Sequence, residues 1–434
     1  MAEIPFRVFL RLHRVRVLIK LSAKDTHTGN EMPIVQRRLS RSFQAFFASE
    51  KAGGIVLIAC TIVSLILANS MIGPAYLAMW HSYIGGMSVE HWVNDGLMAI
   101  FFLLIGLELE REFYSGELSD IRNALLPIFA AAGGIAVPAL IHFGLNYGTG
   151  TQAGIGIPMA TDIAFALGVL ALLGSRVPAS LKVFLTALAV MDDLGAIIVI
   201  AVFYTAKLSA IYLAISLLIW AFLVILNRYL KVVSLIPYLI GGVLMWFFML
   251  KSGVHATIAG VLLGFAIPFS MKEDDETSPS HQLESFLHKP VAFLILPIFA
   301  LANTGLVLGT DSLQTLANHN ELGIMAGLVI GKPFGITLTC FVVVTLGLCR
   351  LPLDLNWKHI FGAGLLGGIG FTMSIFITNL AFATNPAEIN GSKMAILLAS
   401  MTAGTIGFIY LTLFGQPEAF DDDMDTMDFE ENSC

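Results

Sequence analysis

The chain has 434 residues, of which 56% are hydrophobic and only 13% are charged, with a mean hydropathy of +0.81 and a formal net charge of −7. A soluble globular protein carries about 25% charged residues, so this composition excludes that class and indicates a polytopic membrane protein. The four cysteines are scattered, with neither the spacing of a metal site nor a disulfide framework.

Both ends of the chain are strongly charged. The basic arm, residues 1–45, contains FRVFLRLHRVRVLIK, which predicts a cationic helix on anionic lipid headgroups. A disordered arm, or a start codon assigned too far upstream, is an equally good interpretation. The arm does not resemble a signal peptide, because its apolar core is short and interrupted by arginines. Residues 417–434 hold eight acids between Glu418 and Glu431, which predicts a solvated acidic tail.

Residues 46–416 contain twelve apolar stretches, each long enough to cross a hydrocarbon core about 30 Å thick as a helix. They lack the alternating pattern of a membrane β-barrel. The sequence therefore predicts an all-α polytopic membrane domain with about twelve transmembrane helices. Their predicted ranges are 52–70, 93–110, 123–147, 154–174, 180–204, 208–227, 232–250, 253–271, 289–309, 322–347, 358–382 and 393–415.

The basic residues predict how this domain is oriented. Twenty of the 24 lysines and arginines lie before the first span or in loops on the same side. The other side has only Lys207, Lys251 and Lys393, and Lys332 lies inside a span. Because Lys and Arg concentrate in cytoplasmic loops, both termini are predicted to be cytoplasmic.

The fourth and eleventh spans are rich in helix-breaking residues. The fourth contains GIGIPMATDIAFALG, and the eleventh has five glycines within residues 362–370. In a membrane, a broken helix survives only where it lines a cavity or is buried in protein. Two such helices seven spans apart predict an inverted repeat, spans three to five against ten to twelve, with both helices discontinuous. The alternative is close helix packing, since Gly364 and Gly368 form a GxxxG pair.

Two adjacent acids, Asp192 and Asp193, are the only charges in the apolar run 183–206. Each carboxylate costs about 2.5–3.5 kcal/mol at the centre of a membrane helix, so such acids normally face a water-filled cavity and handle ions, protons or substrate. Desolvation favours the protonated form of a carboxyl, and the same group either holds a proton or ligates a hard cation. The alternative is a structural acid capped by hydroxyl groups.

Lys332 is the only lysine or arginine predicted to be buried within a span. A buried ammonium needs a partner, and the acids of the fourth and fifth spans are the candidates. A purely structural ion pair, or a lysine that reaches the membrane surface, is the alternative.

Thr161 and Asp162 lie where the fourth span breaks. Both residue types favour helix N-caps, so capping of the restarted helix is the simplest interpretation. Asp162 and Lys332 would also compensate the partial charges of broken helix ends, and the Thr161 hydroxyl is a suitable ligand for a hard cation.

Five segments resemble the signature regions of the NhaA-type sodium/proton antiporters, in the family's order and spacing. They are ATDIAFALGVLALLGSRVP (160–178), FLTALAVMDDLGAIIVIAVFYT (184–205), LKSGVHATIAGV (250–261), GKPFGI (331–336) and GGIGFTMSIFI (367–377), and the similarity covers about residues 40–415. The resemblance implies that Asp193 is the main cation ligand, that Asp192 is its partner, and that Lys332 pairs with Asp192. It also implies a multi-pass protein of the bacterial inner membrane.

The resemblance further implies a pH-regulating region at the cytoplasmic ends of the spans. Its residues in ELEREF and QLESFLHKP are Glu108, Arg111, Glu112, Glu284 and His288. Glu110 and Ser285 depart from the family pattern, in which a base and a histidine can stand at these positions. His255 lies near the opposite face, where an imidazole with a pKa of about 6.5 either senses pH or simply packs between helices.

These features predict a secondary transporter, not an enzyme, that exchanges cytoplasmic Na⁺ or Li⁺ for external protons and serves sodium and pH homeostasis. Exchange is expected to be electrogenic and activated at alkaline pH, with no cofactor and no nucleic-acid partner. A homodimer is one candidate assembly, but the link at residues 71–91 is short for the extended hairpin through which some family members dimerise.

Two other classes of function fit the sequence less well. A sodium-coupled symporter of an organic solute would need more polar residues in the spans than this chain has. An intramembrane aspartyl protease would use Asp162 with Asp192 or Asp193, but its usual Gly-x-Gly-Asp motif is absent. The phosphate-binding GxxxxGK[ST] motif of a nucleotide-driven pump is absent as well.

Overall fold

A computed structural model describes residues 41–114, 116, 119, 121–205, 208–270, 278–309 and 312–416. The acidic tail predicted at residues 417–434, and the basic arm before residue 41, lie outside these described residues. From Ala45 onward the described residues belong to one unit, and that unit is almost entirely helical.

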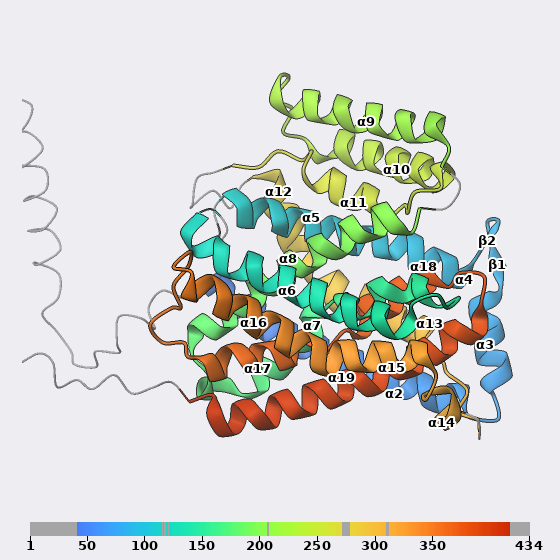
Figure 1. Ribbon diagram of the computed structural model, residues 1–434. Helices are drawn as coiled ribbons and strands as arrows, with labels where there is room; N and C mark the ends of the chain where they lie inside the picture. The colour runs from blue at the N-terminus through green and yellow to red at the C-terminus, as the bar shows by residue number, and fades with distance from the viewer. Residues whose placement is uncertain are drawn as a thin grey trace, which may run out of the picture. The chain divides into compact units, whose positions relative to one another are not determined.

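The secondary-structure elements follow one another in a simple order (Figure 1). The first part of the chain contains α2 (Arg41–Ala68), α3 (Gly73–His81), β1 (Tyr83–Ile84), β2 (Met87–Ser88), α4 (Val89–His91), the π-helical η2 (Trp92–Leu97), α5 (Met98–Tyr114), α6 (Ile121–Asn146), the 3₁₀ helix η3 (Gln152–Met159), α7 (Ile163–Leu172), η4 (Gly174–Arg176) and α8 (Ala179–Phe203). The second part contains α9 (Ala210–Arg228), α10 (Leu235–Ser252), α11 (Ile258–Gly264), α12 (Pro279–Pro290), η5 (Val291–Ile295), α13 (Leu296–Asn303), α14 (Ser312–Thr315), α15 (His319–Ala326), η6 (Gly327–Gly331), α16 (Lys332–Thr345), α17 (Trp357–Gly367), α18 (Phe371–Ala381) and α19 (Pro386–Phe414).

Among the described residues, nine helical segments are long and apolar enough to cross a membrane, or up to eleven if two bent pairs each count as one span. The chain is therefore a polytopic helical membrane protein. The nine segments are Val89–Tyr114, Ala124–Asn146, Gln152–Leu172, Ala179–Phe203, Ala210–Arg228, Leu235–Ser252, Pro279–Asn303, His319–Thr345 and Pro386–Phe414. The count of twelve stays a prediction.

The predicted eighth span, 253–271, contains only the seven-residue helix α11. Glycines explain its short length. Gly253 takes a left-handed conformation, φ +83°, and ends α10. A Cβ atom at Gly260 would overlap the carbonyl of Ala99, and one at Gly264 would overlap the backbone of Gly106. These glycines let α11 lie directly on the backbone of α5.

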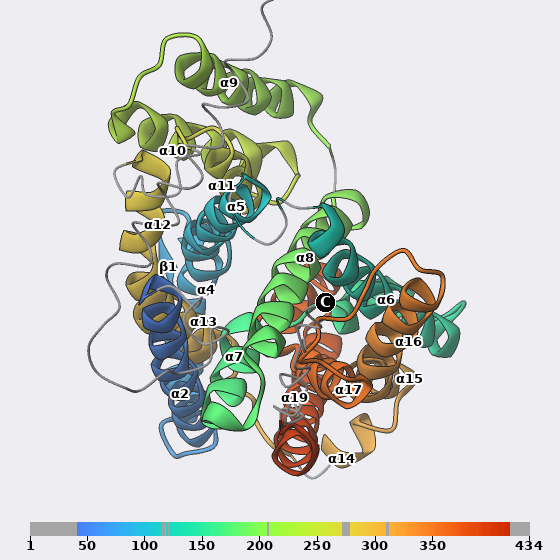
Figure 2. The ribbon, with the colours of Figure 1, turned by 90° about the vertical axis from the view of Figure 1, so that its left-hand side faces the viewer.

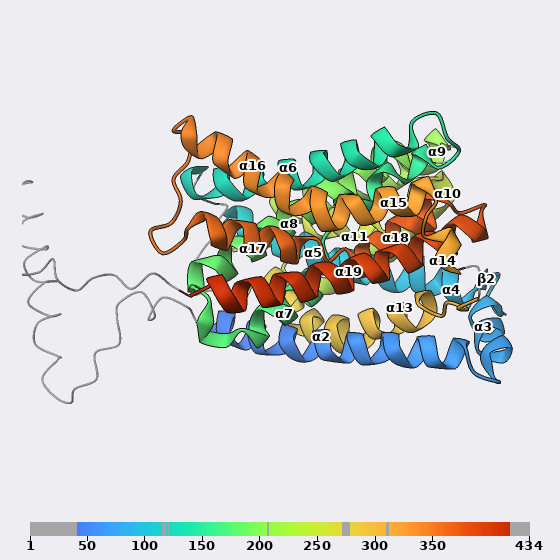
Figure 3. The same ribbon diagram turned by 60° about the horizontal axis from the view of Figure 1, so that its bottom comes forward.

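The helices of this unit form two groups (Figure 2). In one group α6 packs against α8, α15 and α16, while α17 and α18 pack against α19. In the other group α5 packs against α11 and α12, and α10 packs against α9. The spans of both halves of the predicted inverted repeat therefore lie in the first group. Figure 3 shows α15 and α16 running in line, with α17 and α19 beside them.

Two interrupted segments meet inside the first group. Between η3 and α7 the backbone is extended at Ala160 and Asp162, and between α17 and α18 the chain bends by 47°. The two interruptions contact each other directly: Asp162 donates its backbone N–H to the carbonyl of Ile369 at 2.7 Å, and the Thr161 hydroxyl donates to the carbonyl of Gly367 at 2.8 Å. Each break therefore satisfies backbone groups that the other leaves free.

The link at residues 71–91 folds as α3 followed by a two-stranded antiparallel hairpin. Its strands have only two residues each, and Tyr83 pairs with Ser88. The Trp92 indole fastens the hairpin by donating to the carbonyl of Ile84 at 2.9 Å.

Candidate functional site

Lys332 and Asp192 form a buried ion pair between α16 and α8. The ammonium donates to Asp192 Oδ2 at 2.5 Å and to Thr161 Oγ1 at 3.0 Å. Both charged side chains are only 1% exposed. The lysine stem passes over α6 at Gly134, where an added Cβ would lie 3.8 Å from Lys332 Cδ. The stem therefore lies within ordinary contact distance of α6.

Asp193 is as buried as its neighbour but has different surroundings. It is 1% exposed, and none of the ion pairs between described residues includes it. Its Oδ1 atom, like Oδ1 of Asp192, has no hydrogen-bond partner among the described residues, but only Asp192 has an ammonium on its other oxygen. Adjacent helix residues point about 100° apart, which explains why Lys332 reaches Asp192 and leaves Asp193 without an ion pair. A buried carboxylate oxygen without a partner is a rare arrangement that requires an explanation.

Asp162 is held by hydrogen bonds at the crossing of the two interruptions. Its Oδ1 accepts from the backbone N–H of Phe165 at 2.9 Å and so caps α7. Its Oδ2 accepts from the backbone N–H of Thr372 at 3.0 Å and from the Thr372 hydroxyl at 2.5 Å. Three donors fix this carboxyl in position, so it is the least free of the three acids.

The central site therefore contains three buried carboxyls and one buried ammonium. If all four groups were charged, the site would carry a net charge of −2, because three negative charges oppose one positive charge. Isolated buried charge is strongly unfavourable, so protons or a bound cation must compensate it. Carboxylate and hydroxyl oxygens are suitable ligands for a hard cation. The arrangement can hold either a proton or such a cation at Asp193.

Five of the six residues predicted to regulate pH response lie together at the contact between α5 and α12. Arg111 Nε lies 3.0 Å from Glu284 Oε1, and Arg111 Nη2 lies 3.3 Å from Glu112 Oε1. His288 Nε2 lies 3.6 Å from Glu108 Oε1 and 3.7 Å from Glu284 Oε1. We call these five residues the α5–α12 cluster.

The sixth residue, His255, lies apart from this cluster. It is in the turn between α10 and α11, where its Nε2 lies 2.9 Å from the carbonyl oxygen of Tyr204. This contact joins the turn to the end of α8. A packing role, the simpler of its two interpretations, accounts for this contact.

Comparison with known proteins identifies the family. Residues 44–411 match the family model described as Na⁺/H⁺ antiporter 1. The chain belongs to this family. The predicted NhaA-type relationship is therefore confirmed.

Three curated relatives illustrate how close it is. The Na(+)/H(+) antiporter NhaA of Dechloromonas aromatica is 70% identical over 385 residues, which cover 89% of this chain and 99% of the relative. The Na(+)/H(+) antiporter NhaA 1 of Flavobacterium johnsoniae is 60% identical over 374 residues, covering 86% and 97%. The Na(+)/H(+) antiporter NhaA of Mesorhizobium japonicum is 49% identical over 387 residues, covering 88% and 97%.

Sequence reasoning missed two features of this Na⁺/H⁺ antiporter family member. The first is Thr372, whose hydroxyl and N–H both bond to Asp162. Its position two residues after Gly370, in the first turn of the restarted helix α18, is the signal that the sequence offers.

The second missed feature is a buried lysine in α19. The sequence predicts Lys393 at the first residue of the last span, on the side opposite the termini, and Lys332 as the only base buried in the spans; the second prediction is wrong. Lys393 is 5% exposed and donates to Asn303 Oδ1 at 3.3 Å. Asn303 also accepts from Asn379 at 2.6 Å and donates to Asn94 Oδ1 at 2.8 Å. The helix begins at Pro386, seven residues earlier than the predicted span, and so encloses the lysine.

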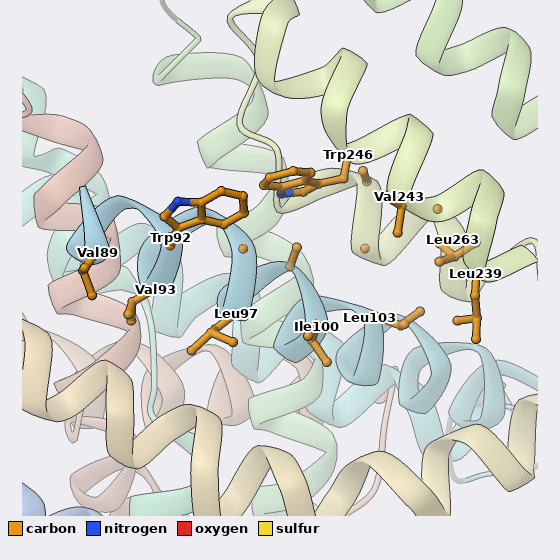
Figure 4. Close-up of a pocket in the computed structure, with 15 residues that line it drawn as sticks. Val89, Trp92, Val93, Leu97, Ile100, Leu103, Leu239, Val243, Trp246 and Leu263 are labelled. Atoms are coloured by element: carbon orange, nitrogen blue, oxygen red, sulfur yellow. The ribbon is translucent and has the colours of Figure 1, made fainter. Parts of the chain in front are cut away.

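An apolar groove lies away from these polar groups. Its volume is 590 Å³, and none of its lining residues is charged. Figure 4 shows that Trp92 and Trp246 face each other across its edge, with ring centroids 5.9 Å apart. The Trp246 indole also donates to the carbonyl of Asp95 at 2.9 Å. A groove without charged or carboxylate side chains is not suited to bind a small hard cation.

Proposed function

We propose that this protein is a secondary active antiporter that exchanges cytoplasmic Na⁺, or Li⁺, for external H⁺. The observation that carries the proposal is Asp193, a buried carboxyl beside a buried ion pair with one oxygen that lacks a hydrogen-bond partner among the described residues. Relatives at 70% and 60% identity are named Na(+)/H(+) antiporters, which supports the same pair of ions here.

In this mechanism Asp193 is the main ligand of the cation, and the Thr161 hydroxyl and Asp192 are placed to assist. A proton and a cation cannot occupy the same carboxylate, so binding of one expels the other. Lys332 holds Asp192 at 2.5 Å and would release it when the cation needs a second carboxylate. If Asp193 gives up one proton and Lys332, freed from Asp192, gives up a second one for each monovalent cation bound, each cycle moves net charge. Transport would therefore be electrogenic.

The interruptions at Ala160–Asp162 and Gly368–Gly370 support discontinuous membrane helices at the centre of the transporter. Broken helices bring backbone partial charges and unpaired polar groups to the depth of the bound ion. We further propose twelve spans with an inverted repeat, both termini in the cytoplasm of a bacterium, insertion in its inner membrane, and a homodimer. The α5–α12 cluster would adjust the rate to pH, so that exchange rises under alkaline conditions.

Purified protein in proteoliposomes tests this function. A pH-sensitive dye inside the vesicles should report Na⁺-dependent proton movement, and Li⁺ should replace Na⁺. Collapse of the membrane potential with valinomycin and K⁺ should change the rate if the cycle is electrogenic. Proton movement that is the same with and without a Na⁺ gradient would contradict the proposal.

A further inference from the structure

The α5–α12 cluster also has the geometry of a metal site. Glu108 and Glu112 are four residues apart on α5, and Glu284 and His288 are four residues apart on α12. Residues at this spacing lie on the same face of a helix, and α5 packs against α12. One ligand atom each from Glu108, Glu284 and His288 lies within 4.8 Å of the other two.

The distances between these atoms fit a small transition-metal ion. His288 Nε2 lies 3.6 Å from Glu108 Oε1 and 3.7 Å from Glu284 Oε1. Zn²⁺ binds histidine nitrogen and carboxylate oxygen at about 2.0–2.2 Å, so neighbouring ligand atoms in a tetrahedral site are separated by about 3.3–3.5 Å. Each nitrogen–oxygen distance therefore needs to shorten by only a few tenths of an ångström, and the two carboxylate oxygens, which lie within 4.8 Å of each other, would close onto the same ion.

Burial and charge favour the same interpretation. The three side chains are 12%, 6% and 19% exposed for Glu108, Glu284 and His288. Two carboxylates and a neutral imidazole carry a charge of −2, which a divalent cation neutralises. One imidazole nitrogen with two oxygens is a ligand set typical of Zn²⁺ and similar ions, whereas Mg²⁺ and Ca²⁺ prefer oxygen alone.

Arg111 is the group that competes with a metal at this place, because its Nε lies 3.0 Å from Glu284 Oε1. Its side chain is 36% exposed and its Nη2 lies 3.3 Å from Glu112 Oε1. A metal that takes Glu284 would therefore leave Arg111 paired with Glu112. Metal binding would therefore remove one of the two carboxylate partners of Arg111 and leave the other.

A small cavity lies between the cluster and the start of α7. It has a volume of 30 Å³ and is lined by Glu108 and His288 at one side and by Ile163 and Ala164 at another. Ile163 directly follows Asp162, the residue at the crossing of the interruptions. An ion at the cluster would lie on the approach to that crossing.

We propose that Glu108, Glu284 and His288 bind a divalent transition-metal ion of the Zn²⁺ class, which ties α5 to α12 and inhibits exchange. The binding part of this proposal is independent of the transported ions. The inhibition rests on the proposed antiport.

Equilibrium dialysis of the full-length purified protein against Zn²⁺, with Mg²⁺ in constant excess, tests the binding. We expect His288→Gln and Glu284→Gln to weaken the tightest Zn²⁺ site by at least about 10-fold, since even loss of an outer partner of a metal ligand costs 10–100-fold. His281→Gln on the same helix is the matched control and should leave this site intact. Equal affinity in the wild type and His288→Gln, or a loss that follows His281 instead, would overturn the proposal.

A second variant gives a spectroscopic signature and does not depend on loss of binding. In His288→Cys a thiolate replaces the imidazole, and soft thiolate ligands favour thiophilic metals. Co²⁺ should produce a thiolate-to-metal charge-transfer band that the wild type lacks, and the preference for Cd²⁺ over Zn²⁺ should rise. A folded His288→Cys protein without this band would show that residue 288 does not reach a metal.

Inhibition is measured in the proteoliposome assay as the ratio of rates with and without Zn²⁺ for each variant. Wild-type exchange should fall with the same Zn²⁺ dependence as binding, and the fall should shift at least about 10-fold in His288→Gln. Zn²⁺ bound at this site without any change in rate would overturn the inhibitory role. Absence of exchange in the wild type without Zn²⁺ would instead contradict the proposed antiport, and dialysis would still decide the metal site.

Discussion

Two buried lysines of this protein show how differently a membrane protein can accommodate the same charge. Lys332 is 1% exposed and has the carboxylate of Asp192 at 2.5 Å. Lys393 is 5% exposed and has the amide oxygen of Asn303 at 3.3 Å, and none of the ion pairs between described residues includes it. The first lysine is held by an opposite charge, whereas the second is held by dipoles.

The difference determines what each lysine can do. A carboxylate partner can exchange its ammonium for a proton or a cation, so the pair at Lys332 can change state. Amide groups of Asn303 cannot titrate, so they can position Lys393 but cannot take part in proton exchange. We therefore expect the pair at Lys332, and not Lys393, to take part in the proposed exchange.

The largest effect is expected at Asp193, the acid next to the Asp192–Lys332 pair. Asp193→Asn should reduce Na⁺-dependent proton movement to the level of empty liposomes, because the amide keeps the volume of the carboxyl but neither releases a proton nor offers a negative ligand. The melting temperature should stay close to that of the wild type. Normal Na⁺-dependent proton release from this purified variant would remove Asp193 from the site.

Substitutions of Asp192 and Lys332 test whether the two buried charges stabilise each other. Removing one partner of a buried pair typically costs about 3–5 kcal/mol, whereas replacing both can be nearly neutral. Asp192→Asn and Lys332→Gln should therefore each lower the melting temperature, and the double variant should recover much of the loss. It should also move less net charge per cycle if it still exchanges ions. Strictly additive losses of stability in detergent would show that the two charges are not coupled.

The pH dependence of the cation affinity tests whether the central site titrates, as the comparison with the amides around Lys393 requires. Below the pKa of the carboxyl that binds Na⁺, protons occupy the site, and the apparent affinity should improve up to about tenfold for each unit that the pH rises. Above that pKa the affinity should become constant. Titrations of Na⁺ at several pH values between 6 and 9 measure this directly. A half-saturating Na⁺ concentration that does not change with pH would exclude simple competition.

The smallest effect is expected at Lys393. Lys393→Met removes one hydrogen bond, worth about 0.5–1.5 kcal/mol, and also removes a buried charge. Asn303 Oδ1 keeps the hydrogen bond from Asn379 at 2.6 Å. The melting temperature should therefore change far less than in Lys332→Gln, and exchange should persist. A loss of stability as large as that of Lys332→Gln would end the distinction between the two lysines.

The features that could be predicted from the sequence are those with a high free-energy cost in a membrane. Two acids and a lysine in apolar runs stand out because each is expensive in a membrane, and the structure brings Asp192 and Lys332 into contact. Their roles in transport stay predictions. The glycines of the eleventh span also marked the bend between α17 and α18.

The sequence could not reveal features that depend on partners far away in the chain. In the sequence Thr372 resembles any other threonine of a membrane span, because its contact with Asp162 is visible only in the folded protein. Lys393 lay at the boundary of an apolar stretch, so only the helix that starts at Pro386 and the amides of Asn303 and Asn379 show that it is buried. The stretch 253–271 is apolar enough to span, but contact between backbones at Gly260 and Gly264 decides its short helix.

The crossing at Asp162 also has a consequence for biosynthesis. Thr372, which donates two hydrogen bonds to this carboxyl, is made 210 residues after it. At about 5–20 residues per second, a ribosome needs roughly 10–40 seconds to cover that distance. During this time local backbone N–H groups such as that of Phe165 can cap the carboxyl, but the backbone N–H of Asp162 lacks its partner, the carbonyl of Ile369. The fourth span of the nascent chain therefore carries unpaired polar groups at its interruption until the eleventh span is made. If translation stops before residue 369, these groups stay unpaired in the bilayer.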